Sequence, residues 1–284
     1  MLLCFLLVVF SATVVLKADE DVLRPRGKSI VPTTAQQHIG LVRNPWALGI
    51  EIGGSLSFFG QSITQHQAPS YQTNLTSGSG IGPFINLAVD FALTDYVGLY
   101  ARLGYDQKRF TMKGYVDGPC ELPIGSGNIR PTRVESTTDQ TINYWVGGVG
   151  IRARFAENWL VTGGISYHSR SSASFRQVDT IVDDSGCEFL DQQGMPVGRR
   201  SEQSGSNTAL FSSQRWSLDL SIGYRIPLSS DIVLVPRFGG QFFLTPLRSN
   251  DEEDFSHPVV GQIYTIRNRT LHALQLAVGL WFNL

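Results

Sequence analysis

Residues 216–226 read Trp216-Ser-Leu-Asp-Leu-Ser-Ile-Gly-Tyr-Arg-Ile226, and large apolar side chains alternate there with small or polar ones. A period of two places the two sets on opposite faces of a β-strand. The second set carries only two charges, Asp219 and Arg225, and is otherwise serine and glycine. The stretch therefore predicts a strand whose faces meet two different surroundings, neither of which is a typical charged, water-facing surface.

The same alternation recurs along the chain from about residue 46 onward. Seven further stretches show it: 46–59, 80–93, 96–106, 141–155, 159–168, 232–242 and 274–284. Within 141–155, Ile142, Tyr144 and Val146 lie in the opposite phase to the apolar residues of 149–155. A β-bulge near Gly147 would reconcile the two halves.

The connections between these stretches alternate between short and long. Short turns lie around residues 94–95, 156–158 and 227–231, whereas 60–79, 107–140, 169–209 and 245–270 are long and polar. All the long connections fall at one end of the strands, as expected of an antiparallel meander. Such a sheet should close on itself, because closure removes unpaired edges. The fold class is therefore all-β, an eight-stranded antiparallel barrel.

The composition of the two faces decides which one points outward. A soluble, lipocalin-like barrel would line a cavity with its apolar face and present charges outside. Here the second face is dominated by glycine, alanine and serine, which suit the crowded interior of a narrow barrel. Aromatic residues also gather near both strand ends, as in the interfacial girdles of membrane barrels. We therefore expect a transmembrane β-barrel with short periplasmic turns and long extracellular loops.

At this level the pattern resembles the small OmpA/OmpX-type outer-membrane β-barrels over residues 46–284. Its most specific piece is the last stretch, Leu274-Gln-Leu-Ala-Val-Gly-Leu-Trp-Phe-Asn-Leu284, which is similar to the C-terminal strand that serves that class as an assembly signal. Members usually end in an aromatic residue, whereas here Phe282 lies two positions inside the end. The resemblance implies a place in the cell outer membrane, with outer-membrane lipid and the assembly machinery as partners.

The N-terminal region has two predicted parts. Residues 1–18 are apolar apart from Lys17 and a few small polar residues, and acidic residues follow at once, so we expect a signal peptide. The lack of a basic residue before the apolar run leaves a retained anchor as the alternative. Residues 19–45 are expected to form a periplasmic extension. Removal of Cys4 with the signal leaves Cys120 and Cys187 in two long loops on one side, for which we predict a disulfide.

Charged residues on the small-residue face form the candidate site. Seven of them are predicted to make a luminal charge network: Glu51, Asp90, Arg102, Arg152, Asp219, Arg225 and Arg237. By their depth in the strands, most should form one layer across the lumen, with Asp219 and Arg225 above or below it. The network has two interpretations, a salt-bridged plug or a gated ion path. The plug is favoured, because a barrel of eight strands leaves little room for a pore.

Other chemistry has little support in the sequence. The 284 residues include 23 basic and 24 acidic ones, so no basic excess favours nucleic acid. No spacing of histidines or cysteines suggests a metal site, and no motif suggests a cofactor. His168 with Ser169 and Ser171 nearby is the one group similar to a hydrolase site, but no acid at strand spacing would orient the histidine. We therefore predict no catalytic residues and no enzyme.

The expected function is a structural or surface-interaction role, with an unknown extracellular ligand bound by the long loops. A plugged barrel of this kind is expected to be a monomer. The alternatives are a lipid-modifying outer-membrane hydrolase and a small-solute channel. This step rests on analogy, since one barrel fold hosts many functions.

Overall fold

The computed structural model describes residues 45–66, 71–121, 126–155, 158–183, 185–190, 195–248, 252–257 and 261–284. The predicted signal peptide, 1–18, and all but the last residue of the predicted extension, 19–45, lie outside the described residues. Among the described residues, no helix is long and apolar enough to span a bilayer.

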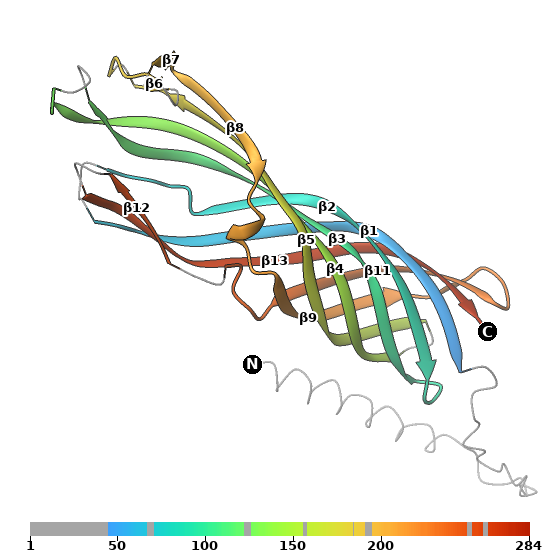
Figure 1. Ribbon diagram of the computed structural model, residues 1–284. Helices are drawn as coiled ribbons and strands as arrows, with labels where there is room; N and C mark the ends of the chain where they lie inside the picture. Colours follow the sequence, from blue (N-terminus) through green and yellow to red (C-terminus); the bar gives the residue numbers. More distant parts are fainter. Residues whose placement is uncertain are drawn as a thin grey trace, which may run out of the picture. The chain divides into compact units, whose positions relative to one another are not determined.

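Eight long antiparallel strands form a ring in the described part of the chain (Figure 1). They are β1 (Trp46–Gln65), β2 (Ser77–Ala92), β3 (Val97–Glu121), β4 (Ile129–Phe155), β5 (Trp159–Ile181), β9 (Gln214–Tyr224), β11 (Ile232–Phe243) and β13 (Gly261–Asn283). Each pairs with its neighbours, and β13 pairs with both β11 and β1, which closes the ring. The predicted eight-stranded barrel is confirmed.

Shorter elements lie in the connections between these eight strands. They are β6 (Phe189–Leu190), β7 (Pro196–Gly198), β8 (Arg200–Ser206), the 3-10 turn η1 (Thr208–Leu210), β10 (Ile226–Pro227) and β12 (Glu253–His257). β8 extends the sheet beside β5, and β12 extends it beside β13. Both lie at the end of the barrel that carries the long connections (Figure 1).

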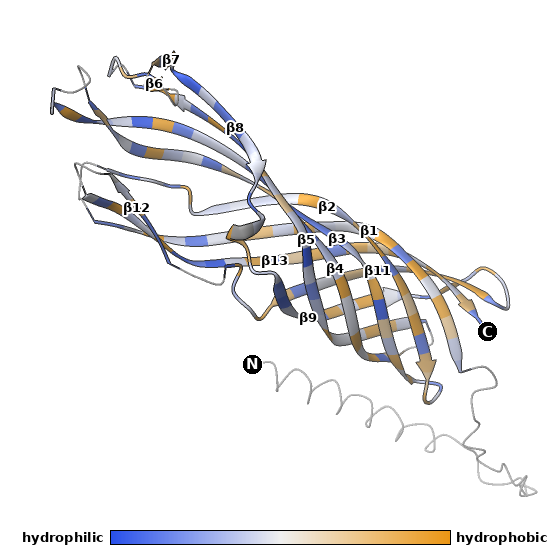
Figure 2. Cartoon of the chain, viewed as in Figure 1, coloured by the Kyte–Doolittle hydropathy of each residue, from blue (hydrophilic) through white to orange (hydrophobic). Residues whose placement is uncertain are grey.

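The barrel is apolar outside and lined with small residues inside. Leu87, Val149 and Leu276 expose 61%, 68% and 67% of their surface on the outer face, and apolar residues band this part of the ribbon (Figure 2). Glycine is required inside, because a Cβ on Gly53 would lie 2.0 Å from the Leu276 carbonyl oxygen. The predicted arrangement is therefore confirmed: the apolar face of the strands points outward and the face of small residues points into the lumen.

Aromatic side chains ring both ends of the apolar band. The ring pairs are Trp46–Phe91, Phe155–Trp159 and Trp159–Tyr224 at the short-turn end, and Tyr105–Trp145 and Tyr167–Trp216 at the other. From Trp46 to Phe58, β1 rises roughly 40 Å. At a tilt of about 40° this projects to roughly 30 Å, enough to cross an apolar band of about 25 Å.

The long connections are not irregular loops, which differs from the prediction. β3 and β4 stay paired from Val97–Ala153 out to Glu121–Ile129, well beyond the aromatic ring. Beyond that ring the outward positions hold polar residues such as Lys113, Glu135 and Thr137, in place of the apolar ones that face lipid. We call the described residues of 60–79, 107–140, 169–209 and 245–270 the platform.

The bulge expected near Gly147 is absent, and that prediction is wrong. Ile142, Tyr144 and Val146 are at most 2% exposed and point inward with Arg152, in one unbroken phase. The register shift between β4 and β5 lies instead between Asn143 and Tyr144. The change of polarity along β4 therefore reflects a change in what the lumen contains, because the inner face becomes apolar towards the platform.

Candidate functional site

Charged side chains inside the barrel pair across it. Arg237 on β11 lies 2.9 Å from Glu51 on β1, and the Tyr100 hydroxyl donates to the same carboxylate at 3.1 Å. The Glu51 side chain is 3% exposed and that of Arg237 9%. A buried charge of this kind is tolerated only with a partner of opposite sign.

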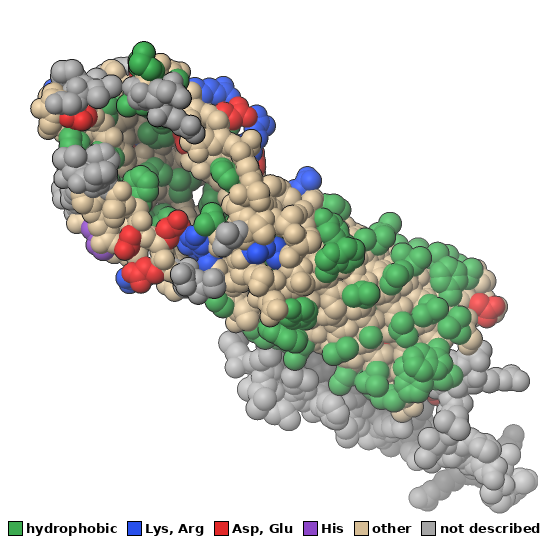
Figure 3. All heavy atoms as spheres, viewed as in Figure 1, with side chains coloured by type: hydrophobic (Ala, Val, Ile, Leu, Met, Phe, Trp, Pro, Cys, Tyr) green, Lys and Arg blue, Asp and Glu red, His purple; other side chains and the backbone are tan. Residues whose placement is uncertain are grey.

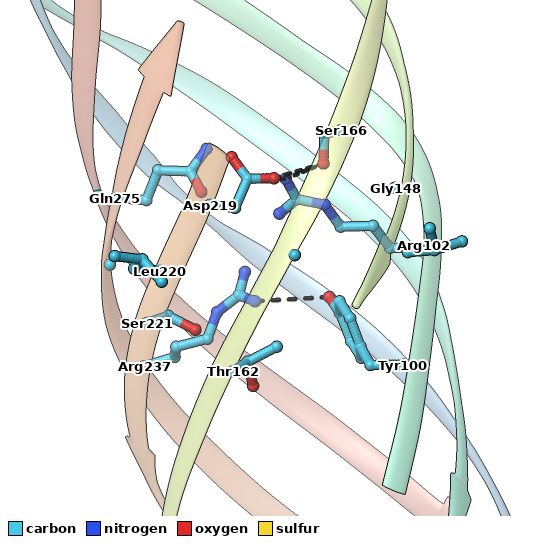
Figure 4. Close-up of a pocket in the computed structure, with 14 residues that line it drawn as sticks. Tyr100, Arg102, Gly148, Thr162, Ser166, Asp219, Leu220, Ser221, Arg237 and Gln275 are labelled. Atoms are coloured by element: carbon cyan, nitrogen blue, oxygen red, sulfur yellow. Dashed lines mark hydrogen bonds and ion pairs between the residues drawn. The ribbon is translucent and has the colours of Figure 1, made fainter. Parts of the chain in front are cut away.

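A second pair spans the middle of the lumen. Arg102 on β3 meets Asp219 on β9 at 2.5 Å and donates to Ser166 on β5 at 2.9 Å. Ser166 also donates to Asp219, so three strands meet at one carboxylate, with Arg237 and Tyr100 in a neighbouring layer (Figure 4). A Cβ at position 148 would lie 2.3 Å from the Ser166 hydroxyl, so a larger residue there would displace this contact.

The third pair lies near the short-turn end of the lumen. Arg152 on β4 contacts Asp90 on β2 at 3.0 Å, and its guanidinium stacks 4.2 Å from the Trp281 ring. Arg225 was predicted to join the network but occupies the rim of this end. It lines the same mouth as Asp90, Arg152 and Arg154, and no ion pair joins it to an acid among the described residues.

Sequence reasoning missed the most buried ion pair. Lys108, 0% exposed, lies 2.8 Å from Asp106 and donates to Ser55 at 2.6 Å. It was missed because the third strand was expected to end at Asp106, which assigned Lys108 to a loop. The signal was present, since Arg102, Asp106 and Lys108 share one phase of the strand.

The histidine considered for hydrolysis is also inside the barrel. His168 is 0% exposed, and its Nε2 lies 2.9 Å from the Ser217 hydroxyl, which donates to Asp219 at 3.0 Å. Ser169 lies on the opposite face of β5, and Ser171 bonds the Asn143 carbonyl. In a Ser-His-Asp triad the acid orients the histidine, whereas here it contacts the serine. The group is a buried hydrogen-bond chain.

The space left between these side chains is small. The central void, lined by Tyr100, Arg102, Asp219, Arg237 and others, measures about 20 Å³. That volume holds about one water molecule. A wider mouth of about 380 Å³ opens at the short-turn end. We call the paired charges around this void the plug.

Above the plug the platform encloses a vestibule of about 510 Å³. Its floor is the stacked pair Phe59 and Phe110, with ring centres 4.6 Å apart. Leu247 and Phe211, from two of the long connections, belong to or pack against the apolar cluster that contains Phe59 and Phe110. The lining combines apolar and polar side chains. Its apolar members include Ile63, Leu75, Met112, Val116, Val134, Phe189, Leu210, Phe255, Tyr264 and Ile266. The side formed by β4 and β5 is mainly polar, with Ser136, Thr138, Gln140, Gln177 and Asp179.

Covalent and polar contacts hold the platform walls together. Cys120 at the end of β3 is bonded to Cys187, with Cα atoms 6.3 Å apart, which confirms the predicted disulfide. The same end of β3 is also joined to β13, because the Tyr264 hydroxyl donates to the Asp117 carbonyl, and burial raises the pKa of that hydroxyl. Asp117 also accepts from Arg133 at 2.9 Å, and this hydrogen bond raises the pKa of the guanidinium.

A comparison with known protein families matches residues 34–245 to the outer membrane protein beta-barrel domain. The chain belongs to this family. Membership of the outer membrane protein beta-barrel domain family confirms the resemblance to small OmpA/OmpX-type barrels and the location in the cell outer membrane, surrounded by outer-membrane lipid. No match is found among curated proteins.

Solved structures of this outer-membrane class are similar in fold at low sequence identity. Ail, the attachment invasion locus protein of Yersinia pestis, shares 10% identity over 83% of this chain and 98% of its own, with a TM-score of 0.27. Neisserial surface protein A shares 6% over 84% and 99%, with a TM-score of 0.33. OprG from Pseudomonas aeruginosa shares 10% over 83% and 96%, with a TM-score of 0.31. At these scores they say nothing about this protein's function.

Proposed function

We propose that this outer-membrane barrel is a non-conducting, non-enzymatic surface-binding protein. The observation that carries the proposal is the combination of a plugged lumen with a braced, hollow platform outside the membrane. The barrel anchors and orients the platform, and the platform recognises molecules outside the cell.

The plug argues against transport. Three ion pairs lie inside the lumen, whose central void is about 20 Å³: Glu51–Arg237 is buried, whereas Arg102–Asp219 and Asp90–Arg152 are partly buried. An ion path would require these pairs to open, and a buried charge that loses its partner costs several kcal/mol. The same crowding leaves His168 and Ser217 without room for a substrate.

The platform favours binding because it is built of paired strands. Binding surfaces on rigid elements lose less conformational entropy than free loops when they engage a ligand. The Cys120–Cys187 bond and the Tyr264–Asp117 contact both brace it at the end of β3. A purely structural barrel would need neither the long hairpins nor the hollow between them.

The first test is electrical. Purified protein in a planar phospholipid bilayer should give no conductance steps at neutral pH. Stepwise conductance would overturn the proposal and favour the channel.

The second test removes the outer part of the β3–β4 hairpin. Residues 112–138 are replaced by Asn-Gly and Cys187 by serine, which joins the strands where Thr111 pairs with Asp139. Wild-type and shortened proteins in nanodiscs are then applied to arrays of glycans and extracellular-matrix proteins. Binding by the wild type that the shortened barrel loses supports the proposal. Equal signals from both would overturn it.

A further inference from the structure

We propose that the vestibule binds a free, single-chain amphiphile, a long apolar chain with an anionic head group, taken from outside the cell. This inference rests on the proposed function and names the ligand class for the platform. The argument uses the lining of the vestibule, its position above the membrane, and the placing of its charges.

The volume and lining fit a small apolar ligand. About 510 Å³ lies within the usual range of small-molecule pockets, about 300–1,000 Å³. The floor is the Phe59–Phe110 stack, and Ile63, Met112 and Val116 rise above it on β1 and β3. These side chains face inward although they lie above the aromatic ring, where no lipid surrounds the chain.

Exposed apolar side chains continue this surface to the rim. Leu210 on η1 is 45% exposed and Phe255 on β12 is 51% exposed, and both line the vestibule. Large apolar side chains held open to water at the mouth of a hollow are typical of a binding surface. Figure 3 shows the hollow, with apolar side chains inside it and charged ones at its edge.

Two arginines on one side of the vestibule suit an anionic head group, although Asp179 on the other side balances the charge of the whole lining. Arg248 and Arg269 both contact one carboxylate oxygen of Glu253, so the lining on this side carries two cations and one anion. Arg248 also donates to the Leu210 carbonyl at 2.7 Å, which holds its guanidinium beside the apolar rim. The remaining charged lining residue, Asp179, lies on β5 and accepts from Gln177. Guanidinium groups match carboxylates and phosphates in geometry.

The position of the vestibule identifies the source. It lies beyond the Tyr105–Trp145 and Tyr167–Trp216 pairs, and therefore outside the acyl region of the bilayer. A membrane lipid would have to leave the bilayer to reach the Phe59–Phe110 floor. An amphiphile dissolved outside the cell meets the open side directly.

The test measures binding of cis-parinaric acid, a fluorescent long-chain carboxylic acid, to the full chain in phosphatidylcholine nanodiscs. Nanodiscs are used because detergents are themselves single-chain amphiphiles, and empty nanodiscs give the background. We expect saturable binding to one site above this background. Absence of saturable, protein-dependent binding would overturn the inference.

Matched variants place the site. Thr138→Trp fills the vestibule from the inner face of β4 and should weaken binding at least tenfold. Thr137→Trp, one residue away on the outer face, should leave binding unchanged. If Thr138→Trp does not fold, Gln177→Trp fills the same space from β5. Wild-type affinity in the folded filling variant would overturn the site.

The head group is tested with the methyl ester of the same probe. Arg248→Gln should weaken binding of the acid at least threefold and leave the ester unchanged. Equal effects on acid and ester would overturn the anionic preference. These results are separable from the proposed function. If the protein does not conduct and its binding to the arrays needs the hairpin, the proposed function stands. If that same protein does not bind parinaric acid, only the present inference is overturned.

Discussion

The membrane part of the barrel and the platform use the same strands with opposite polarity. On β3, Leu103 faces lipid while Arg102 and Lys108 face inward; beyond the aromatic ring, Phe110 faces inward and Lys113 faces water. The strand keeps its period of two throughout. The comparison teaches that the surroundings, rather than the backbone geometry, set which face is apolar.

The largest effect is expected from breaking a charge pair in the lumen. Glu51→Leu leaves Arg237 buried without its carboxylate and should lower the free energy of unfolding by about 3–5 kcal/mol. Adding Arg237→Met to that variant should recover most of the loss. Urea unfolding in phosphatidylcholine vesicles measures both. A loss below about 1 kcal/mol in the single variant would mean that water already solvates Arg237, and that the lumen is wet.

The next largest effect is expected on the outer face of β4, which meets lipid in the barrel and water in the platform. Val149 and Thr137 both point outward, the first to lipid and the second above the membrane. Val149→Arg should make folding into vesicles less favourable by about 2–4 kcal/mol, whereas Thr137→Arg should leave the free energy of folding nearly unchanged. Similar losses for both would show that the lipid boundary has been misplaced along the strand.

A smaller, local effect is expected from the disulfide. Replacing Cys120 and Cys187 by serine removes a link that spans 67 residues, worth at most about 4 kcal/mol in the chain-entropy model. The barrel already restrains both ends, so the measured loss should be well below that figure. Limited proteolysis should cut the platform of the variant faster while the barrel fragment survives. Faster loss of the barrel itself would mean that the two regions unfold together.

The smallest effect concerns the exposed pair Arg176–Glu202 at 2.8 Å. The hydrogen bond from Arg176 lowers the pKa of Glu202, so any stabilisation is present above the ordinary pKa of a glutamate and lost as pH falls through the lowered value. Because both groups are solvent-exposed, Glu202→Gln should give the same pH profile of platform proteolysis as the wild type between pH 3 and 7. A clear difference at pH 7 would show a stronger coupling than the exposure allows.

Much of the barrel was predictable because lipid-facing strands need strict alternation. The positions of the strands, the small interior and the Cys120–Cys187 bond all followed from residue type and spacing. The outer hairpins were not predicted, because beyond the aromatic ring the apolar residues change to the inward face and the outward face becomes polar. Lys108 was missed for a different reason, because β3 extends past the expected end at Asp106.

The change of polarity along the inner face of β4 shows why one rule was insufficient. Ile142 and Tyr144 were interpreted as outward-facing because apolar residues face outward elsewhere in the barrel. They face inward because the lumen becomes an apolar cluster that closes the top of the plug. Sequence patterns record the contrast between two faces, and they record which face is outside only when the surroundings stay the same along the strand.

The pairing of β13 with β1 has a consequence for how the chain folds. The ring closes through contacts such as Ala47 with Asn283, which are among the most distant in the sequence. Contacts of this range form slowly, because a long stretch of chain must be ordered before they add stability. Until they form, β1 and β11 each present an unpaired edge that another chain can join. We therefore expect yield to depend on how quickly β13 reaches its place, and variants that slow this step to aggregate even when their closed barrels are stable.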